Sequence, residues 1–155
     1  MSDRRTKEWT PTAEEAFGPM GKKGLEGELF MMDVFNSWGW YATHHEDDKE
    51  KQIQGIDISF QNPKWANEYT CDVKNNMDEK GNIRIEKKWF QGKKALKCDR
   101  IFHVNPNTGW IVYYGVPEMA DSYDYTKDYM VLPAWERKKN YSFMSVARMK
   151  NKNAG

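Results

Sequence analysis

Cysteine, histidine and long apolar runs are all scarce in this chain of 155 residues. Two cysteines, Cys71 and Cys98, are too few for the disulfide framework of a small secreted domain, and the absence of a Cys/His cluster argues against a zinc site. No apolar run approaches the roughly 18 residues of a membrane-spanning helix. Residues 1–12 are polar and charged, unlike a secretory signal. We therefore expect a cytoplasmic protein that makes no membrane contact.

Aromatic residues, in contrast, are abundant. The chain has 7 Trp, 8 Tyr and 7 Phe, so it can form a core despite a mean hydropathy of -0.94. Its length suits one domain, and we expect an N-terminal arm over 1–20, a single domain over 21–150 and a tail over 151–155. The richness in Lys and Asn is typical of an AT-rich genome, such as that of a phage.

The net charge of +1 hides an uneven distribution. Residues 24–79 contain twelve acids and four lysines, whereas residues 80–100 contain eight bases and two acids. Residues 136–155 add six bases and one acid. An acidic segment between basic ones suits a metal-dependent enzyme that acts on a polyanion, although ordinary solvated charge would give the same pattern.

Hydrophobic periodicity predicts an α/β chain whose mixed, largely antiparallel central sheet is flanked by helices. The segment 46–50 is expected to be a loop, and 78–82 a hairpin turn. Helices are predicted at 13–17, 23–37, 87–96 and 117–123, and strands at 40–44, 53–60, 68–75, 83–86, 101–104, 110–116, 129–132 and 141–146.

Two of the predicted strands contain the residues that point most directly to chemistry. Asp57 lies in one of them, and the next contains Cys71-Asp72-Val73-Lys74. Because residues two apart on a strand share a face, Asp72 and Lys74 should project side by side while Cys71 and Val73 face a core. Two carboxylates and an ammonium gathered at one point suit a divalent metal and a phosphodiester.

A third carboxylate is expected from the helix predicted over 23–37. Projected at 100° per residue, Glu28 falls within the apolar face and Glu26 falls outside it. An unpaired carboxylate on a core-facing stripe is costly, and a metal site would resolve that cost. The alternative is that Glu28 reaches the rim and pairs with a lysine. The apolar face consists of Leu25, Leu29, Met31, Met32, Phe35 and Trp38.

Together these motifs resemble a known family. Lys23-Gly24-Leu25-Glu26-Gly27-Glu28-Leu29 is similar to the opening helix of archaeal-type Holliday junction resolvases, with Glu28 in place of that family's helix glutamate. Ile56-Asp57 and Asp72-Val73-Lys74 resemble the two motifs of the wider PD-(D/E)xK nuclease superfamily, with Ile in place of Pro and Asp in place of Glu. The resemblance covers about residues 22–76.

The resemblance implies a restriction-endonuclease-like core and a nuclease that depends on Mg²⁺, for which Mn²⁺ should substitute. Asp57, Asp72, Glu28 and the backbone carbonyl of Val73 would hold the metal. Lys74 would orient the attacking water or stabilise the transition state, and neighbouring cations should keep Asp72 ionised. The expected substrate is branched or structured DNA, and the resolvase likeness implies a homodimer.

Basic residues around these motifs are candidate contacts to the nucleic acid, and Trp89 or Phe90 could stack on an exposed base. Other functions remain open: an exonuclease or restriction-type enzyme of the same fold, a non-catalytic nucleic-acid-binding module, or a protein-interaction domain. The segment His44-His45-Glu46-Asp47-Asp48 resembles a metal cluster by composition, but adjacent histidines on a strand point apart, so solvated residues are expected there instead. The candidate DNA contacts are Lys22, Lys23, Asn75, Lys87, Lys88, Lys93 and Lys94.

Overall fold

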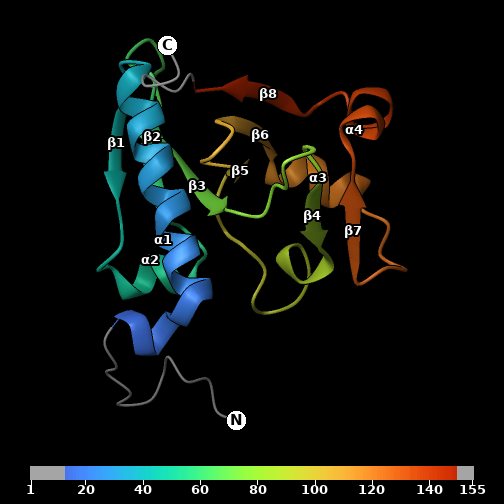
Figure 1. Cartoon of the computed structure of the whole chain (residues 1–155), viewed down its shortest axis with the longest axis horizontal. Helices are drawn as coiled ribbons and strands as arrows, with labels where there is room; N and C mark the ends of the chain where they lie inside the picture. Colours follow the sequence, from blue (N-terminus) through green and yellow to red (C-terminus); the bar gives the residue numbers. More distant parts are fainter. Residues whose placement is uncertain (1–12, 150–155) are drawn as a thin grey trace.

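The computed structural model describes residues 13–149, with side chains from Lys22 onward, and its centre is a six-stranded sheet (Figure 1). The strand order is β1-β2-β3-β5-β6-β8; β3 and β5 run parallel, and the other neighbours are antiparallel. The predicted mixed sheet flanked by helices is therefore confirmed. The strands are β1 (Tyr41–His44), β2 (Ile58–Gln61), β3 (Tyr69–Lys74), β5 (Arg100–Val104), β6 (Trp110–Gly115) and β8 (Ser145–Arg148).

Helix α1 (Ala13–Ser37) covers one face of this sheet (Figure 1). Its buried residues pack on alternate residues of the central strands, as the two-residue period of a strand requires. Phe35 is fully buried and stacks on Phe60 of β2 with ring centroids 4.8 Å apart, while Phe102 of β5 meets it edge-on at 5.5 Å. These aromatic contacts fix the helix against the sheet.

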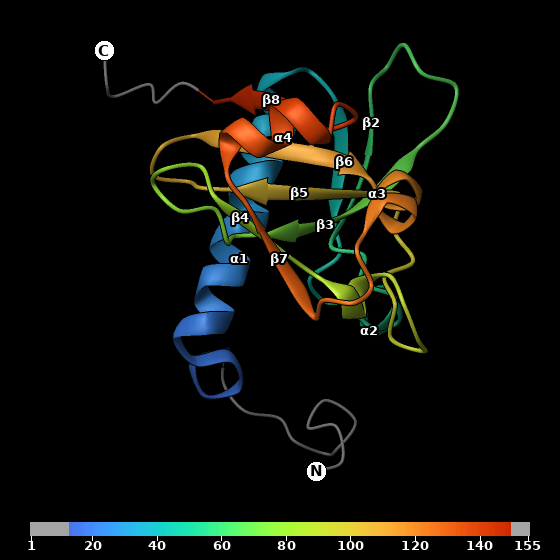
Figure 2. The same ribbon diagram turned by 90° about the vertical axis from the view of Figure 1, so that its right-hand side faces the viewer.

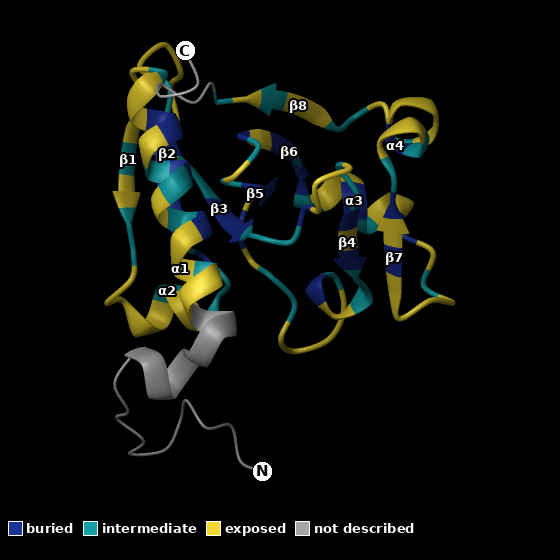
Figure 3. Ribbon diagram, in the orientation of Figure 1, coloured by how far each residue is buried: buried dark blue, intermediate teal, exposed yellow. Residues whose placement is uncertain are grey.

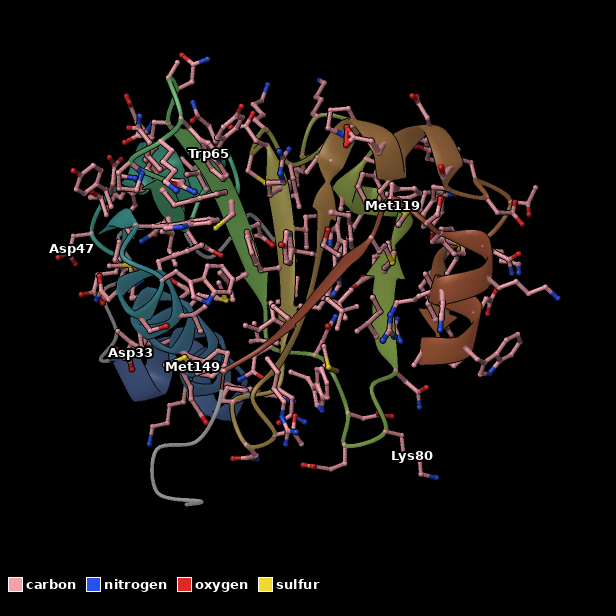
Figure 4. The ribbon with its side chains drawn as sticks, turned by 90° about the horizontal axis from the view of Figure 1, so that it is seen from above. Asp33, Asp47, Trp65, Lys80, Met119 and Met149 are labelled. Atoms are coloured by element: carbon pink, nitrogen blue, oxygen red, sulfur yellow. The ribbon has the colours of Figure 1, made fainter. Side chains whose placement is uncertain are left out.

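A second layer covers the opposite face (Figure 4). It contains the two-stranded antiparallel sheet of β4 (Ile83–Glu86) and β7 (Tyr129–Leu132), together with α3 (Val116–Ser122), α4 (Ala134–Asn140) and the 3-10 turn η2 (Lys87–Trp89). The inner residues of β4 and β7 are buried, and the outer ones form part of the exposed surface in Figure 3. The short helix α2 (Lys49–Ile53) precedes β2.

Three segments near the site have other secondary structure than predicted. Glycines with positive φ cause two of the differences, and a helix cap causes the third. The strand predicted at 53–60 begins only at Ile58, since α2 ends at Ile53 and Gly55 adopts a positive φ of 73°. The helix predicted at 87–96 is reduced to η2, and Gly92 has a φ of 84°, which a helix does not accommodate. The loop predicted at 46–50 instead leads into α2, which Asp48 caps by accepting from the Lys51 N–H.

A further difference concerns strand pairing. The predicted turn at 78–82 forms, but it does not join a hairpin: β3 pairs with β2 and β5, while β4 crosses to the other layer and pairs with β7. Helix α4 was not predicted, and the last strand lies at 145–148 rather than 141–146.

At the amino end, α1 runs unbroken from Ala13, so it joins the expected short helix at 13–17 to the one at 23–37 and crosses residue 20, where the arm was expected to end. Residues 1–12 of that arm and the tail over 151–155 lie outside the described residues. Gly39, at a φ of 75°, follows the helix as predicted.

Candidate active site

The candidate site lies where β2 and β3 separate. The pairing between the two strands ends at Ile58 and Cys71, and Asp57 is the residue just before β2. The Asp57 N–H donates to the Cys71 carbonyl over 2.8 Å, and its carboxylate Oδ2 accepts from the Val73 N–H over 2.7 Å. The carboxylate thus takes the place that a β2 backbone group would occupy in a continued ladder.

Asp72 and Lys74 project side by side from β3, as predicted. Cys71 and Val73 are buried under α1, whereas Lys74 faces the second layer, where its Nζ lies 4.7 Å from the centre of the Trp89 ring. Asp72 is 5% exposed, and Lys74 Nζ is 2.9 Å from its Oδ2. This ion pair is the polar contact that Oδ2 makes among the described residues, and no further hydrogen bond reaches the buried oxygen.

Burial perturbs both carboxyls strongly. It raises the pKa of Asp72 to about 7; Lys74 opposes the shift and Asp57 adds to it. Burial also raises the pKa of Asp57 to about 6, and the charge of Glu28 adds to that effect. Without a metal, desolvation outweighs the Lys74 charge, so Lys74 alone does not restore the ordinary pKa of Asp72. That neighbouring cations, the metal included, keep Asp72 ionised stays a prediction. Carboxyls that resist ionisation are typical of a site that another cation completes.

Lys74 is held charged by its surroundings. Burial lowers the pKa of its ammonium, but the Asp72 and Asp57 carboxylates overcome this, and the pKa is raised overall. Trp89 is 5% exposed, so its predicted role in stacking on an exposed base is wrong. Its ring faces the Lys74 ammonium instead, an interaction that no local sequence signal indicates, since η2 reaches β3 only through the fold.

Behind Lys74, the buried His103 links two layers of the protein. Its Nδ1 donates to Asn76 Oδ1 and its Nε2 accepts from the Tyr114 hydroxyl, both over 2.7 Å. Asn76 Nδ2 donates in turn to the Arg84 carbonyl over 2.9 Å. Burial lowers the pKa of His103 to about 3, so this imidazole is neutral and structural. The network fixes β4 relative to the end of β3.

Glu28 lies beside the site, but its carboxylate is paired with His44. Its Oε1 is 2.7 Å from His44 Nε2, and burial raises its pKa although His44 opposes the shift. His44 ends β1, within the strand predicted at 40–44, but its side chain is paired with Glu28 and mostly buried rather than solvated as expected. His45 Nε2 points elsewhere, to Ser59 Oγ at 2.7 Å.

The predicted apolar face of α1 is rotated in the structure. Leu25 is 36% exposed and Leu29 is 49% exposed, whereas Gly27 faces the sheet so closely that a Cβ there would lie 2.8 Å from the Asn75 Cβ. Glu28, next to Gly27, consequently lies at the edge of the buried stripe rather than in its middle. Glu26 is exposed. The choice of Glu28 over Glu26 as the acid nearer the site agrees with this geometry.

We call the point where β2 and β3 separate the fork. The donor atoms at the fork fit a hard divalent cation. Asp57 and Asp72 supply carboxylate oxygens, and the buried Asp72 Oδ2 is contacted by the Lys74 ammonium with no further hydrogen bond among the described residues. Mg²⁺ is commonly bound through one or two carboxylates with water completing its shell. Within the described part of the chain, no three His, Cys, Asp or Glu side chains form a ready-made metal group. Glu28 is therefore near the two aspartates without forming a three-ligand cage with them.

The candidate DNA contacts fall in two groups on either side of the fork. Lys22 and Lys23 are exposed on α1. Asn75 Nδ2 donates to the Lys23 carbonyl over 2.8 Å, so the Asn75 side chain joins the end of β3 to α1. The other group follows β4: Lys87 lies 3.5 Å from Asp128, Lys88 lies 3.5 Å from Glu86, and Lys93 and Lys94 are exposed in the next loop.

Comparison with known proteins adds one finding on the fold. No family model matches the chain, and no curated protein matches it. The fold is similar to that of a bacterial homing endonuclease, I-Ssp6803I. The two chains are 12% identical with a TM-score of 0.56, and the match covers 82% of this chain and 89% of that one. Within residues 13–149, no helix is both long and apolar enough to cross a membrane.

Proposed function

We propose that this protein is a metal-dependent nuclease that hydrolyses phosphodiester bonds in DNA. The observation that supports this best is the convergence of Asp57, Asp72 and Lys74 at the fork between β2 and β3. The similarity of the fold to a homing endonuclease also supports it. A buried pair of carboxyls with raised pKa values beside an ammonium is costly for stability, and nuclease chemistry gives it a use.

The residues of the fork have distinct roles in this proposal. Asp57 and Asp72, with the Val73 carbonyl and Glu28 as further candidates, would hold Mg²⁺, for which Mn²⁺ should substitute. The bound cation would neutralise charge on the scissile phosphate and activate a water as the nucleophile. Lys74, fixed between Asp72 and the Trp89 ring, would donate hydrogen bonds to the reacting phosphate or orient the water.

The form of the DNA is a second part of the proposal. The resolvase resemblance over about residues 22–76 implies branched DNA, cut by a homodimer so that both strands are reached. A restriction-type enzyme that cuts ordinary duplex is the alternative, and the exposed two-stranded layer of β4 and β7 favours it. Either form agrees with a cytoplasmic, phage-encoded enzyme.

Cleavage of labelled DNA tests the proposal. Duplex, single-stranded, flap and four-way-junction substrates are incubated with Mg²⁺, Mn²⁺ or EDTA, and we expect metal-dependent internal cuts with 5′-phosphate ends. Shortening from the ends alone would indicate an exonuclease. If none of the substrates is cut with either metal, catalysis is refuted and a binding module becomes the better description.

The site assignment needs its own variants. Asp72→Asn and Lys74→Met should each lower cleavage by about a thousandfold or more, as expected when a group that acts on the transition state is lost. The matched controls are Asp78→Asn and Lys80→Met, in the exposed turn that follows β3. An Asp72→Asn protein that cleaves at the wild-type rate would refute the assignment.

A further inference from the structure

The two-stranded sheet of β4 and β7 presents an unusual outer face. Its inner residues are buried, but Arg84, Glu86, Tyr129 and Val131 point outward. Val131 is 53% exposed and Tyr129 is 47% exposed, although both lie in regular strands. In Figure 2 this ribbon lies at the front of the molecule, with β7 crossing over the central sheet. The face therefore combines two exposed apolar side chains with a guanidinium and a carboxylate on rigid strands, a mixture that can contact both apolar and hydrogen-bonding groups of a partner.

Arg84 is the cation of that face, and two neighbours contact its guanidinium. Its guanidinium carbon lies 3.8 Å from the centre of the Tyr129 ring, and its Nε is 4.0 Å from Glu86 Oε2, a loose contact. Stacking occupies a flat side of the guanidinium and leaves its N–H edge available. An arginine held in this way is prepared for two parallel hydrogen bonds to one partner. The Arg84 carbonyl is tied to Asn76, so the residue is fixed relative to the candidate site.

Three cations and two acids lie together at the end of the ribbon nearest to η2. Arg84, Lys87, Lys88 and Gln91 line an open cavity of about 690 Å³ together with Tyr129. Asp128 and Glu86 also line it, each 3.5 Å from one of the two lysines. Ion pairs this exposed are weak, so the lysines can exchange these acids for phosphates. The same segment continues into Trp89, whose ring contacts Lys74.

We propose that the outer face of the β4–β7 ribbon lies in the major groove of duplex DNA and contacts base edges there. This inference rests on the proposed action on DNA and adds sequence recognition to it. The major groove admits a two-stranded ribbon. There a guanine presents two acceptors that match the Arg84 guanidinium, and a thymine methyl can contact Val131. Lys87 and Lys88, at the edge of the ribbon, contact the phosphates beside the groove.

The composition of the face favours DNA over a protein partner. A protein interface is depleted in lysine at its centre, and here the exposed apolar area is small and bordered by Lys87, Lys88 and Lys127. A surface that contacts phosphates alone needs no Arg84–Tyr129 stack and no exposed Val131 between its cations. Contacts to base edges use both the stacked arginine and the exposed valine.

Selection from a pool of duplexes with a randomised central segment tests the inference. The full chain is used with Ca²⁺ in place of Mg²⁺ to limit cutting. We expect the wild type to enrich a motif, and Arg84→Lys to lower the preference for one G·C pair by about tenfold, because lysine keeps the charge but loses the bidentate fork. Arg148→Lys is the matched control: its guanidinium also stacks on an aromatic ring, Trp110, at 4.9 Å, but on β8.

The selection overturns the inference if the wild type enriches no motif, if Arg84→Lys leaves the motif unchanged, or if Arg148→Lys has an equal effect. The inference would also fail if Val131→Asp changed the particle mass in sedimentation and left the motif intact, since the face would then be a protein interface. Cleavage is measured separately. A chain that cuts DNA without a motif refutes the ribbon alone, and one that enriches a motif without cutting refutes the nuclease alone.

Discussion

The Val73 N–H donates to the Asp57 carboxylate over 2.7 Å, at the point where the β2–β3 ladder has just ended. A backbone donor there would otherwise need water or another strand, since buried N–H groups are rarely left unpaired. The side chain of Asp57 therefore closes the end of the ladder and is fixed by it. The same contact brings a carboxylate next to Asp72, one residue before Val73.

This contact predicts different effects for two substitutions of Asp57. Both Asp57→Asn and Asp57→Ala should abolish metal-dependent cleavage. Only Ala leaves the Val73 N–H without an acceptor, and we expect it to be about 1–3 kcal/mol less stable than Asn. Urea unfolding of the two variants in EDTA measures the difference. Equal stabilities would show that the hydrogen bond contributes nothing to the fork.

The raised carboxyl pKa values predict how stability depends on pH. Asp72 has a pKa of about 7 in the fold against an ordinary 3.8, so between these values the folded protein binds more protons than the unfolded chain. Stability is therefore highest below pH 4 as far as this group is concerned, and it is lost as the pH rises to 7, by about 4 kcal/mol for Asp72 alone.

Unfolding in EDTA between pH 4 and pH 8 measures this slope, and Asp57→Asn is the matched variant. It removes one titrating group and also the charge that raises the Asp72 pKa, so its slope should be shallower. Mg²⁺ competes with protons for the same oxygens, and the stabilisation it gives should be larger at pH 8 than at pH 5. A slope identical in the two proteins would contradict the prediction.

The contact between Trp89 and Lys74 predicts an effect on turnover. Trp89→Leu removes the ring that faces the ammonium and should lower kcat by about tenfold, with little change in KM. Trp89→Phe keeps an aromatic face and should restore most of the rate. Both variants lose packing in a buried position, so both should be destabilised by about 1–4 kcal/mol. If the two have equal kcat, Trp89 has only a packing role.

The orientation of the strand residues at the site was predictable from sequence, but their surroundings were not. Alternation along β3 correctly gave the orientation of Asp72 and Lys74, because side-chain direction on a strand depends only on position parity. Trp89 and His44 reach the site from distant segments, and no periodicity encodes which segment lies above which. The same limit explains the hairpin predicted at 78–82: its turn forms, but pairing is decided by the layer that β4 joins.

Helix α1 shows a second limit. A projection places residues by angle alone, and the large side chains of Leu25 and Leu29 suggested the centre of the buried face. The structure centres it instead on Gly27 and Met31, because close approach to Asn75 requires a residue without a side chain. A small residue can therefore mark the closest contact of a helix more surely than a large one.

That rotation leaves Glu28 at the edge of the site, bound to His44, and gives the last prediction. Glu28→Gln keeps a hydrogen-bond partner for His44 but removes the charge that raises the Asp57 pKa, and it should lower cleavage by at least about tenfold. Glu26 lies two residues before Glu28 and is exposed, so Glu26→Gln should cleave like the wild type. Rates at saturating Mg²⁺ and the Mg²⁺ concentration for half-maximal rate separate a loss of chemistry from weaker metal binding. If Glu26→Gln is the damaging change, the face of α1 toward the DNA has been assigned wrongly. If neither matters, Asp57 and Asp72 are sufficient to hold the metal.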